Sequence, residues 1–183
     1  MPLLILALLS DGATDLLGSD HWFRNFVFII YTPLEYLLLC LIIASYLHNK
    51  TIRKIIYISI PVFIIISLVD QLWLKEKGSY FYDYLDVLIE NPLICVWTLF
   101  YFFQLASDNN ELSFRNNPMF WVCLGNLLFY SATSFSYGFG GYLKHIGNKE
   151  YADIVDFIGK VFNLLLYFFY IIAFSCTWTR KKF

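Results

Sequence analysis

Long runs of apolar residues, separated by short polar segments, dominate the chain. A transmembrane helix needs about 20 predominantly apolar residues, because the hydrocarbon core of a bilayer is about 30 Å thick. Five runs reach this length and predict five membrane-spanning helices, near Trp22–Leu47, Ile55–Leu74, Phe81–Ala106, Met119–Tyr142 and Tyr151–Trp178. The runs are continuous rather than alternating. This pattern favours helices, which satisfy their backbone hydrogen bonds internally, over the strands of a β-barrel.

The N-terminal stretch Pro2–Leu17 is a sixth, marginal candidate for a span. Asp11 and Asp15 interrupt its apolar residues, and it lacks the basic n-region of a secretory signal peptide. Three interpretations stay open: a partly polar span, an interfacial helix, or a span cut short. The expected fold class is therefore all-α, a polytopic transmembrane helical bundle of five spans plus this marginal sixth, forming a single domain over residues 1–183.

The composition supports a membrane location. Hydrophobic residues make up 59% of the chain, aromatic residues 21%, and charged residues only 15%. A soluble domain normally contains about 45–50% apolar and about 25% charged residues. Water does not accommodate so much apolar surface on a chain this short, whereas lipid does.

Basic residues in the loops predict the orientation, because cytoplasmic loops are enriched in Lys and Arg. Lys50, Arg53 and Lys54 follow the first predicted span, and residues 180–182 form a basic C-terminal tail. These two positions lie on the same side if five spans alternate. The opposite side collects most of the acidic residues: Asp11, Asp15, Asp20, Glu76, Asp83, Asp86, Glu150 and Asp153. We therefore expect a cytoplasmic C-terminus and an acidic outer face.

Two glutamates at membrane depth are the main candidates for function. Glu35 falls near the middle of the first predicted span and Glu90 in the outer part of the third. An ionisable residue at depth costs roughly 2.5–3.5 kcal/mol on insertion scales, so it is a functional candidate by default. Each glutamate also neighbours a proline, Pro33 or Pro92, which frees a backbone carbonyl about one turn back. Two interpretations stay open: a polar cavity, or a protonated glutamate that donates to the freed carbonyl and serves only packing.

The fourth predicted span adds a polar stripe, mostly in its outer half. The stripe consists of Asn126, Ser131, Thr133, Ser134, Ser136 and Tyr137. Hydroxyls and small residues often serve helix packing in membranes, and this explains most of the stripe. The functional alternative is an outward-facing cavity with the two glutamates at its base. The residues expected to bind a ligand or ion in that cavity are Glu35, Glu90, Asn91, Asn126, Tyr31 and Tyr130.

The fifth predicted span holds two opposite charges, Asp156 and Lys160. They are spaced i,i+4, so they share one face of a helix. We expect an ion pair within the membrane, which lowers the cost of placing two charges there. A functional role is the less favoured interpretation.

Several chemistries are not supported by any motif. The four cysteines fall in different apolar runs, without CxxC or Cys/His metal spacing, so they are expected to be small buried hydrophobes. The histidines lie near span ends or in loops, which argues against axial haem ligation. No HExxH, GxSxG or Walker motif occurs. No metal or cofactor is expected, and an enzyme is not favoured. The basic groups are too few for a nucleic-acid surface and more simply face anionic lipid headgroups.

The block from Asn117 to Ser131, NPMFWVCLGNLLFYS, predicts the start and packing of a helix. Pro118 suits a first helical position, where its missing N–H is not needed. Gly125 allows close approach of another helix.

The same block resembles the P-x-F-W-(I/V)-x-x-G-x-L-(I/L)-Y-x-S stretch of small multi-pass membrane proteins of Bacteroidota, with Phe129 in place of the Tyr. Segments 31–36 and 163–165, the latter followed by the basic tail, are similar to that group as well, and the resemblance covers most of residues 22–182. Typical members begin with a fuller hydrophobic span than Pro2–Leu17. The resemblance implies the same topology and a bacterial inner-membrane location. The group has no established activity.

Three hypotheses for function follow, in order of preference. The first is a sensor or transport-type module that binds a small ligand, cation or proton at Glu35 and Glu90. The second is a structural or accessory subunit, docked on a membrane-protein partner or on copies of itself. The third is an intramembrane enzyme acting on lipid, which requires the two glutamates to face each other across a lipid-accessible cleft.

Overall fold

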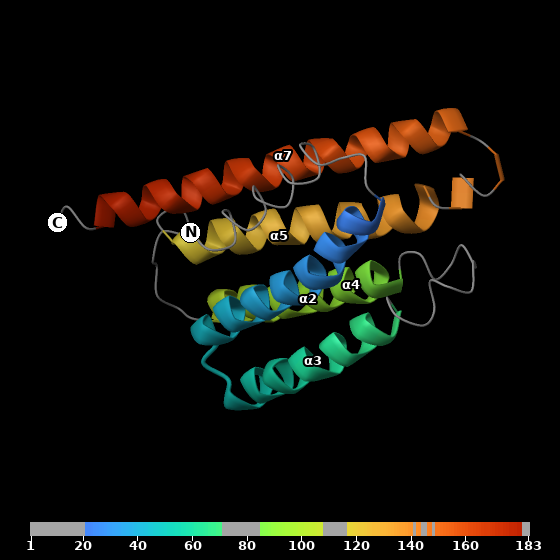
Figure 1. Cartoon of the computed structure of the whole chain (residues 1–183). Helices are drawn as coiled ribbons and strands as arrows, with labels where there is room; N and C mark the ends of the chain where they lie inside the picture. The colour runs from blue at the N-terminus through green and yellow to red at the C-terminus, as the bar shows by residue number, and fades with distance from the viewer. Residues whose placement is uncertain are drawn as a thin grey trace. The chain divides into compact units, whose positions relative to one another are not determined.

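Figure 1 shows the computed structural model of the chain, in which every described element is helical. The structure describes residues 21–70, 85–107, 117–140, 142–143, 146–147 and 149–180. The helices are α2 (His21–Tyr46), α3 (Lys50–Val69), α4 (Leu85–Ser107), α5 (Pro118–Phe135), the π-helical turn η5 (Ser136–Gly140) and α7 (Lys149–Arg180). The all-α fold class is confirmed over these residues. The marginal span Pro2–Leu17 lies outside them.

Within the described residues, three helical segments are long and apolar enough to cross a membrane: α3, α4 and the segment Asp153–Cys176 of α7. The apolar part of α2, Ile30–Tyr46, is shorter. Helix α5 has 18 residues and contains Asn126 and several hydroxyl side chains. The chain therefore has the helices of an integral membrane protein.

Side-chain caps begin two of the helices. Asn49 accepts hydrogen bonds from the backbone N–H groups of Thr51 and Ile52 at 2.9 and 3.4 Å, so α3 starts at Lys50. The predicted span began later, at Ile55, because the polar first turn of α3 lies outside the apolar run. Asn117 accepts a hydrogen bond from the N–H of the second helical residue of α5 at 3.1 Å. The predicted helix start at Pro118 is confirmed.

Contacts within the chain form two compact units, Met1–Glu90 and Asn91–Phe183, with the boundary inside α4. In the first unit α2 packs against α3 as an antiparallel pair (Figure 1). The rings of Tyr36 and Phe63 lie 4.3 Å apart at the centre of this pair. Their neighbours in the core are fully buried aliphatic side chains: Leu39, Ile43 and Ile56.

In the second unit, α5 and α7 run side by side over most of their length (Figure 1). Gly125 of α5 allows this close approach, because an added Cβ there would lie 3.0 Å from Cβ of Phe169 and 3.2 Å from Cδ1 of Leu166. Trp121, one turn before the glycine, stacks on Phe169 with ring centroids 5.9 Å apart. The predicted packing role of Gly125 is confirmed.

Candidate functional site

Three carboxyl groups gather in the first unit, and we call Glu35, Asp86 and Glu90 the acidic cluster. Asp86 and Glu90 occupy the first two turns of α4 at i,i+4 spacing, so they share one helix face. Both are buried, with 2% and 3% of their surface exposed. Glu35 of α2 is half-buried, and its charge and that of Asp86 both act on Glu90. The two glutamates predicted as site residues are therefore neighbours.

One carboxyl oxygen of Glu90, Oε1, is buried without a hydrogen bond in the part of the chain that the structure describes. Asp86, in contrast, accepts a hydrogen bond from the N–H of Val87 at 2.9 Å. A buried polar group without a partner costs about 1–3 kcal/mol, and a charged one costs more. Ionisation of Glu90 is therefore costly, because its buried Oε1 atom has no hydrogen bond among the described residues to offset the loss of water.

Polar side chains of α2 and α3 adjoin the acidic cluster. The thiol of Cys40 lies within electrostatic range of Glu90 and within hydrogen-bonding range of Tyr36 and Ser59. The hydroxyls of Tyr36 and Ser59 are 2.8 Å apart, and Ser59 donates to the carbonyl of Ile56 at 2.8 Å. The polar groups of Tyr36, Ser59 and Cys40 thus lie together at the interface between α2 and α3, within electrostatic range of Glu90.

The arrangement determines what the acidic cluster can hold. Three ionised carboxylates in a buried setting repel one another, and their desolvation costs several kcal/mol each. A proton or a cation removes this cost. The described part of the chain contains no group of three or more His, Cys, Asp or Glu side chains placed to hold a metal ion. A proton needs no such group, because it binds to a single carboxyl oxygen.

Asn91, the next predicted site residue, belongs to the second unit. It is 2% exposed, and its amide donates to the hydroxyl of Thr133 at 3.1 Å. Thr133 in turn donates to the carbonyl of Phe129 at 2.8 Å. The first bond joins α4 to α5, and the threonine hydroxyl acts as both acceptor and donor. These bonds serve helix packing, the alternative considered for the polar stripe.

Asn126 and Tyr130 lie in the interior of the second unit. Asn126 is fully buried, and its Oδ1 accepts a hydrogen bond from the hydroxyl of Tyr170 at 2.7 Å. Its Nδ2 has no hydrogen-bond partner within the described ranges. Tyr130 is 3% exposed, and Tyr31 in the first unit is half-buried. Asn126 therefore joins α5 to α7 through Tyr170.

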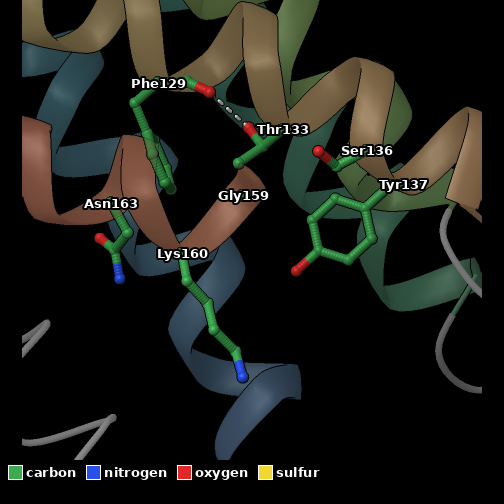
Figure 2. A pocket seen from close by; sticks show the side chains of 7 residues that line it. All are labelled: Phe129, Thr133, Ser136, Tyr137, Gly159, Lys160 and Asn163. Atoms are coloured by element: carbon green, nitrogen blue, oxygen red, sulfur yellow. Dashed lines mark hydrogen bonds between the residues drawn. The ribbon is translucent and has the colours of Figure 1, made fainter. Parts of the chain in front are cut away.

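A pocket of about 320 Å³ opens between α5 and α7 (Figure 2). Its lining residues are Phe129, Thr133, Ser136, Tyr137, Gly159, Lys160 and Asn163. Of the residues named from the sequence as candidates, Lys160 lines this pocket, whereas Asn126 and Tyr130 do not. The side chain of Asp156 lies outside the described residues, so its ion pair with Lys160 stays a prediction.

Two residues near Glu90, Asp86 and Cys40, are not among the site residues predicted from the sequence. Asp86 was assigned only to the acidic outer side, although its i,i+4 spacing to Glu90 already places both on one helix face. Cys40 was assigned only as a small hydrophobe, and no sequence signal indicates its proximity to Glu90. Comparison of the chain with protein-family models, curated proteins and solved structures gives no match.

Proposed function

We propose that this protein is a small sensor or transport-type membrane module that binds a proton at the acidic cluster. The observation that carries the proposal is Glu90, which is 3% exposed and has an Oε1 atom without a hydrogen bond among the described residues. The charges that act on this carboxyl belong to two further carboxyl groups, Glu35 and Asp86. A buried acid in this setting is stabilised by a proton and destabilised by its loss.

The proton would act as a switch on the contact between α2 and the start of α4. With Glu90 neutral, the two helix segments pack with little electrostatic cost. When Glu90 loses its proton, its charge faces that of Glu35 in a buried setting, and repulsion favours a second arrangement or the entry of water or a cation. A ligand shifts such an equilibrium by its different affinity for the two states. Intramembrane carboxyl groups serve proton relays in this way.

The burial of Glu90 also bears on the hypothesis of an enzyme acting on lipid. That chemistry requires a lipid substrate to reach both glutamates across an open cleft. Glu35 is half-buried and Glu90 is 3% exposed. Proton binding needs no such access, because a proton reaches a buried group through hydrogen-bonded side chains or transient water.

We further propose that the chain crosses a bacterial inner membrane five times, with the C-terminus in the cytoplasm. The support is the length of the apolar runs, the basic loop at Lys50–Lys54, the basic tail, and the resemblance to small membrane proteins of Bacteroidota. In this topology the acidic cluster lies in the outer half of the bilayer. Protons would then reach it from outside the cell. A sixth span at Pro2–Leu17 would place the N-terminus in the cytoplasm as well.

Infrared difference spectroscopy of the protein in phosphatidylcholine nanodiscs tests the proton site. A change of pH is expected to produce a band for the C=O stretch of a protonated buried carboxyl. Glu90→Gln is expected to remove this band, and Glu35→Gln to shift it, because Glu35 acts on Glu90 electrostatically. Glu150→Gln, at an exposed position in the first turn of α7, is the matched control and is expected to leave the band unchanged.

Three outcomes would count against the proposal. If the band persists in the Glu90→Gln protein, the proton is held elsewhere. If sodium or potassium raises the unfolding temperature of the parent protein but not of Glu90→Gln, the cluster holds a cation in place of a proton. If neither a carboxyl band nor a cation effect occurs, the buried glutamates serve packing alone, as expected for a structural subunit.

A further inference from the structure

The pocket between α5 and α7 shares no residue with the acidic cluster, and the proposed proton binding does not involve it. It lies entirely within the second unit, and the π-helical turn η5 supplies two of its lining residues, Ser136 and Tyr137. Single π-helical turns within helical segments frequently occur at functional sites. A pocket of about 320 Å³ is also at the lower end of the volume range for small-molecule sites.

The charge of the pocket favours an anion. Among the described residues that line the pocket, Lys160 is the one charged side chain and none is acidic; the side chain of Asp156, one turn earlier on α7, lies outside the described residues. In Figure 2 the side chain of Lys160 starts between Asn163 and Tyr137, and its ammonium end extends beyond both. An ammonium group has three donor hydrogens and an asparagine amide has two, so these groups offer several donors to one acceptor-rich ligand. The predicted ion pair with Asp156 uses one hydrogen of the Lys160 ammonium, and two hydrogens remain for a ligand.

The surroundings of the pocket are apolar and exposed. On α7, Phe157, Val161 and Leu164 have 66%, 42% and 72% of their surface exposed. They flank Lys160 within Asp153–Cys176, the segment of α7 that is able to cross a membrane. A free inorganic anion gains nothing from such a surface. A membrane lipid can lay its acyl chains along this face, because Phe157, Val161 and Leu164 offer it apolar side chains within the membrane-spanning segment.

We propose that this pocket binds the anionic phosphodiester headgroup of a membrane lipid. Lys160 and Asn163 contact the phosphate oxygens, the hydroxyl of Tyr137 lies at the other side of the headgroup, and the acyl chains run along the exposed apolar face of α7. Lys160 is seven residues from Asp153, about 10 Å along the helix axis. A lysine at this depth extends its charged end toward the headgroup layer.

Ser136 and Gly159 shape the inner wall of the pocket. Ser136 donates to the carbonyl of Val155 at 3.4 Å, which joins η5 to α7. A Cβ added at Gly159 would lie 3.6 Å from the Ser136 hydroxyl, an ordinary contact. Alanine is therefore accommodated at residue 159, whereas a longer side chain projects into the space that the headgroup occupies. Gly159 thus offers a way to fill the pocket without removing the lysine.

Native mass spectrometry of the purified protein with defined lipids tests this proposal. Phosphatidylglycerol supplies the anionic headgroup, phosphatidylcholine is the zwitterionic control, and sodium phosphate is the free anion. The parent protein is expected to retain one phosphatidylglycerol at least about tenfold more tightly than phosphatidylcholine, because the choline cation of phosphatidylcholine neutralises its phosphate and is repelled by Lys160. Sodium phosphate is expected not to displace the lipid at the same concentration.

Variants separate the pocket from general surface charge. Lys160→Met and Gly159→Leu are expected to abolish the preference for phosphatidylglycerol, and Lys160→Arg to retain it. Lys50→Met removes one positive charge from an exposed position in the first unit and is expected to leave the preference unchanged. The proposal is wrong if Lys160→Met binds as the parent does, or if Lys50→Met loses as much affinity as Lys160→Met. Displacement by sodium phosphate at equal concentration would overturn the assignment to lipid.

Discussion

Replacing Gly125 with alanine tests how tightly α5 and α7 are packed. The added Cβ would lie 3.0 Å from Cβ of Phe169 and 3.2 Å from Cδ1 of Leu166. The leucine methyl group is able to move by rotation of its side chain. The Cβ of Phe169 is bonded directly to the backbone, so α7 itself must shift to relieve the contact.

The magnitude follows from two opposing contributions. Alanine stabilises a helix interior by about 1 kcal/mol relative to glycine. Overpacking of a well-packed interface costs about 1–3 kcal/mol. Gly159→Ala is the matched control, because it makes the same exchange on α7 with an ordinary contact of 3.6 Å to Ser136. The difference in unfolding free energy between the two variants isolates the packing cost, and we expect Gly125→Ala to be about 1–3 kcal/mol less stable than Gly159→Ala.

Unfolding titrations with sodium dodecyl sulphate in mixed micelles measure this difference. The fluorescence of Trp121 is a useful signal, because its ring stacks on Phe169 at the same interface. Equal free energies of unfolding for Gly125→Ala and Gly159→Ala would refute the close approach of α5 and α7 at Gly125. A smaller loss for Gly125→Ala than for Gly125→Leu is expected, since the larger side chain needs a greater separation of the helices.

Two hydrogen bonds between helices give further predictions. Tyr36→Phe removes the 2.8 Å bond to Ser59 but keeps the ring contact with Phe63, so we expect a loss of about 0.6–2 kcal/mol in unfolding free energy. Additive effects of Tyr36→Phe and Ser59→Ala in a double-mutant cycle would contradict the bond. Tyr170→Phe leaves Oδ1 of Asn126 without its 2.7 Å donor and is expected to cost about 1–3 kcal/mol in the same titration. A Tyr170→Phe protein as stable as the parent would show that Asn126 gains a replacement donor.

The apolar runs predict where the helices lie, but they do not always predict where each helix begins and ends. Pro118 and its Asn117 cap were visible as a local signal, and α5 begins there. Helix α3 begins at Lys50, five residues before the predicted Ile55, because a helix continues beyond the apolar run once Asn49 caps it. Hydropathy reports what lipid accepts, and hydrogen bonding determines where the helix ends.

The sequence predicts individual residues of the candidate sites, but not which of these residues lie together. Glu35 and Glu90 stand out by their depth in the chain's apolar runs, but their proximity depends on which helix faces which, and loop lengths do not determine that. Asp86 was recoverable from its spacing to Glu90. Cys40 was not, because a cysteine in an apolar run gives no sign of its neighbours across the helix pair. Ser136 and Tyr137 were recognised as polar, while the π-helical turn that contains them has no signature in the apolar pattern.

That π-helical turn determines how far residues 136–140 are rotated about the helix axis relative to α5. A π-helical turn bonds each N–H to the carbonyl five residues back and so holds one residue more than an α-helical turn. One residue corresponds to about 100° of rotation around a helix axis. A length change of one residue within this turn would therefore alter which of Ser136 and Tyr137 faces the pocket that Lys160 also lines.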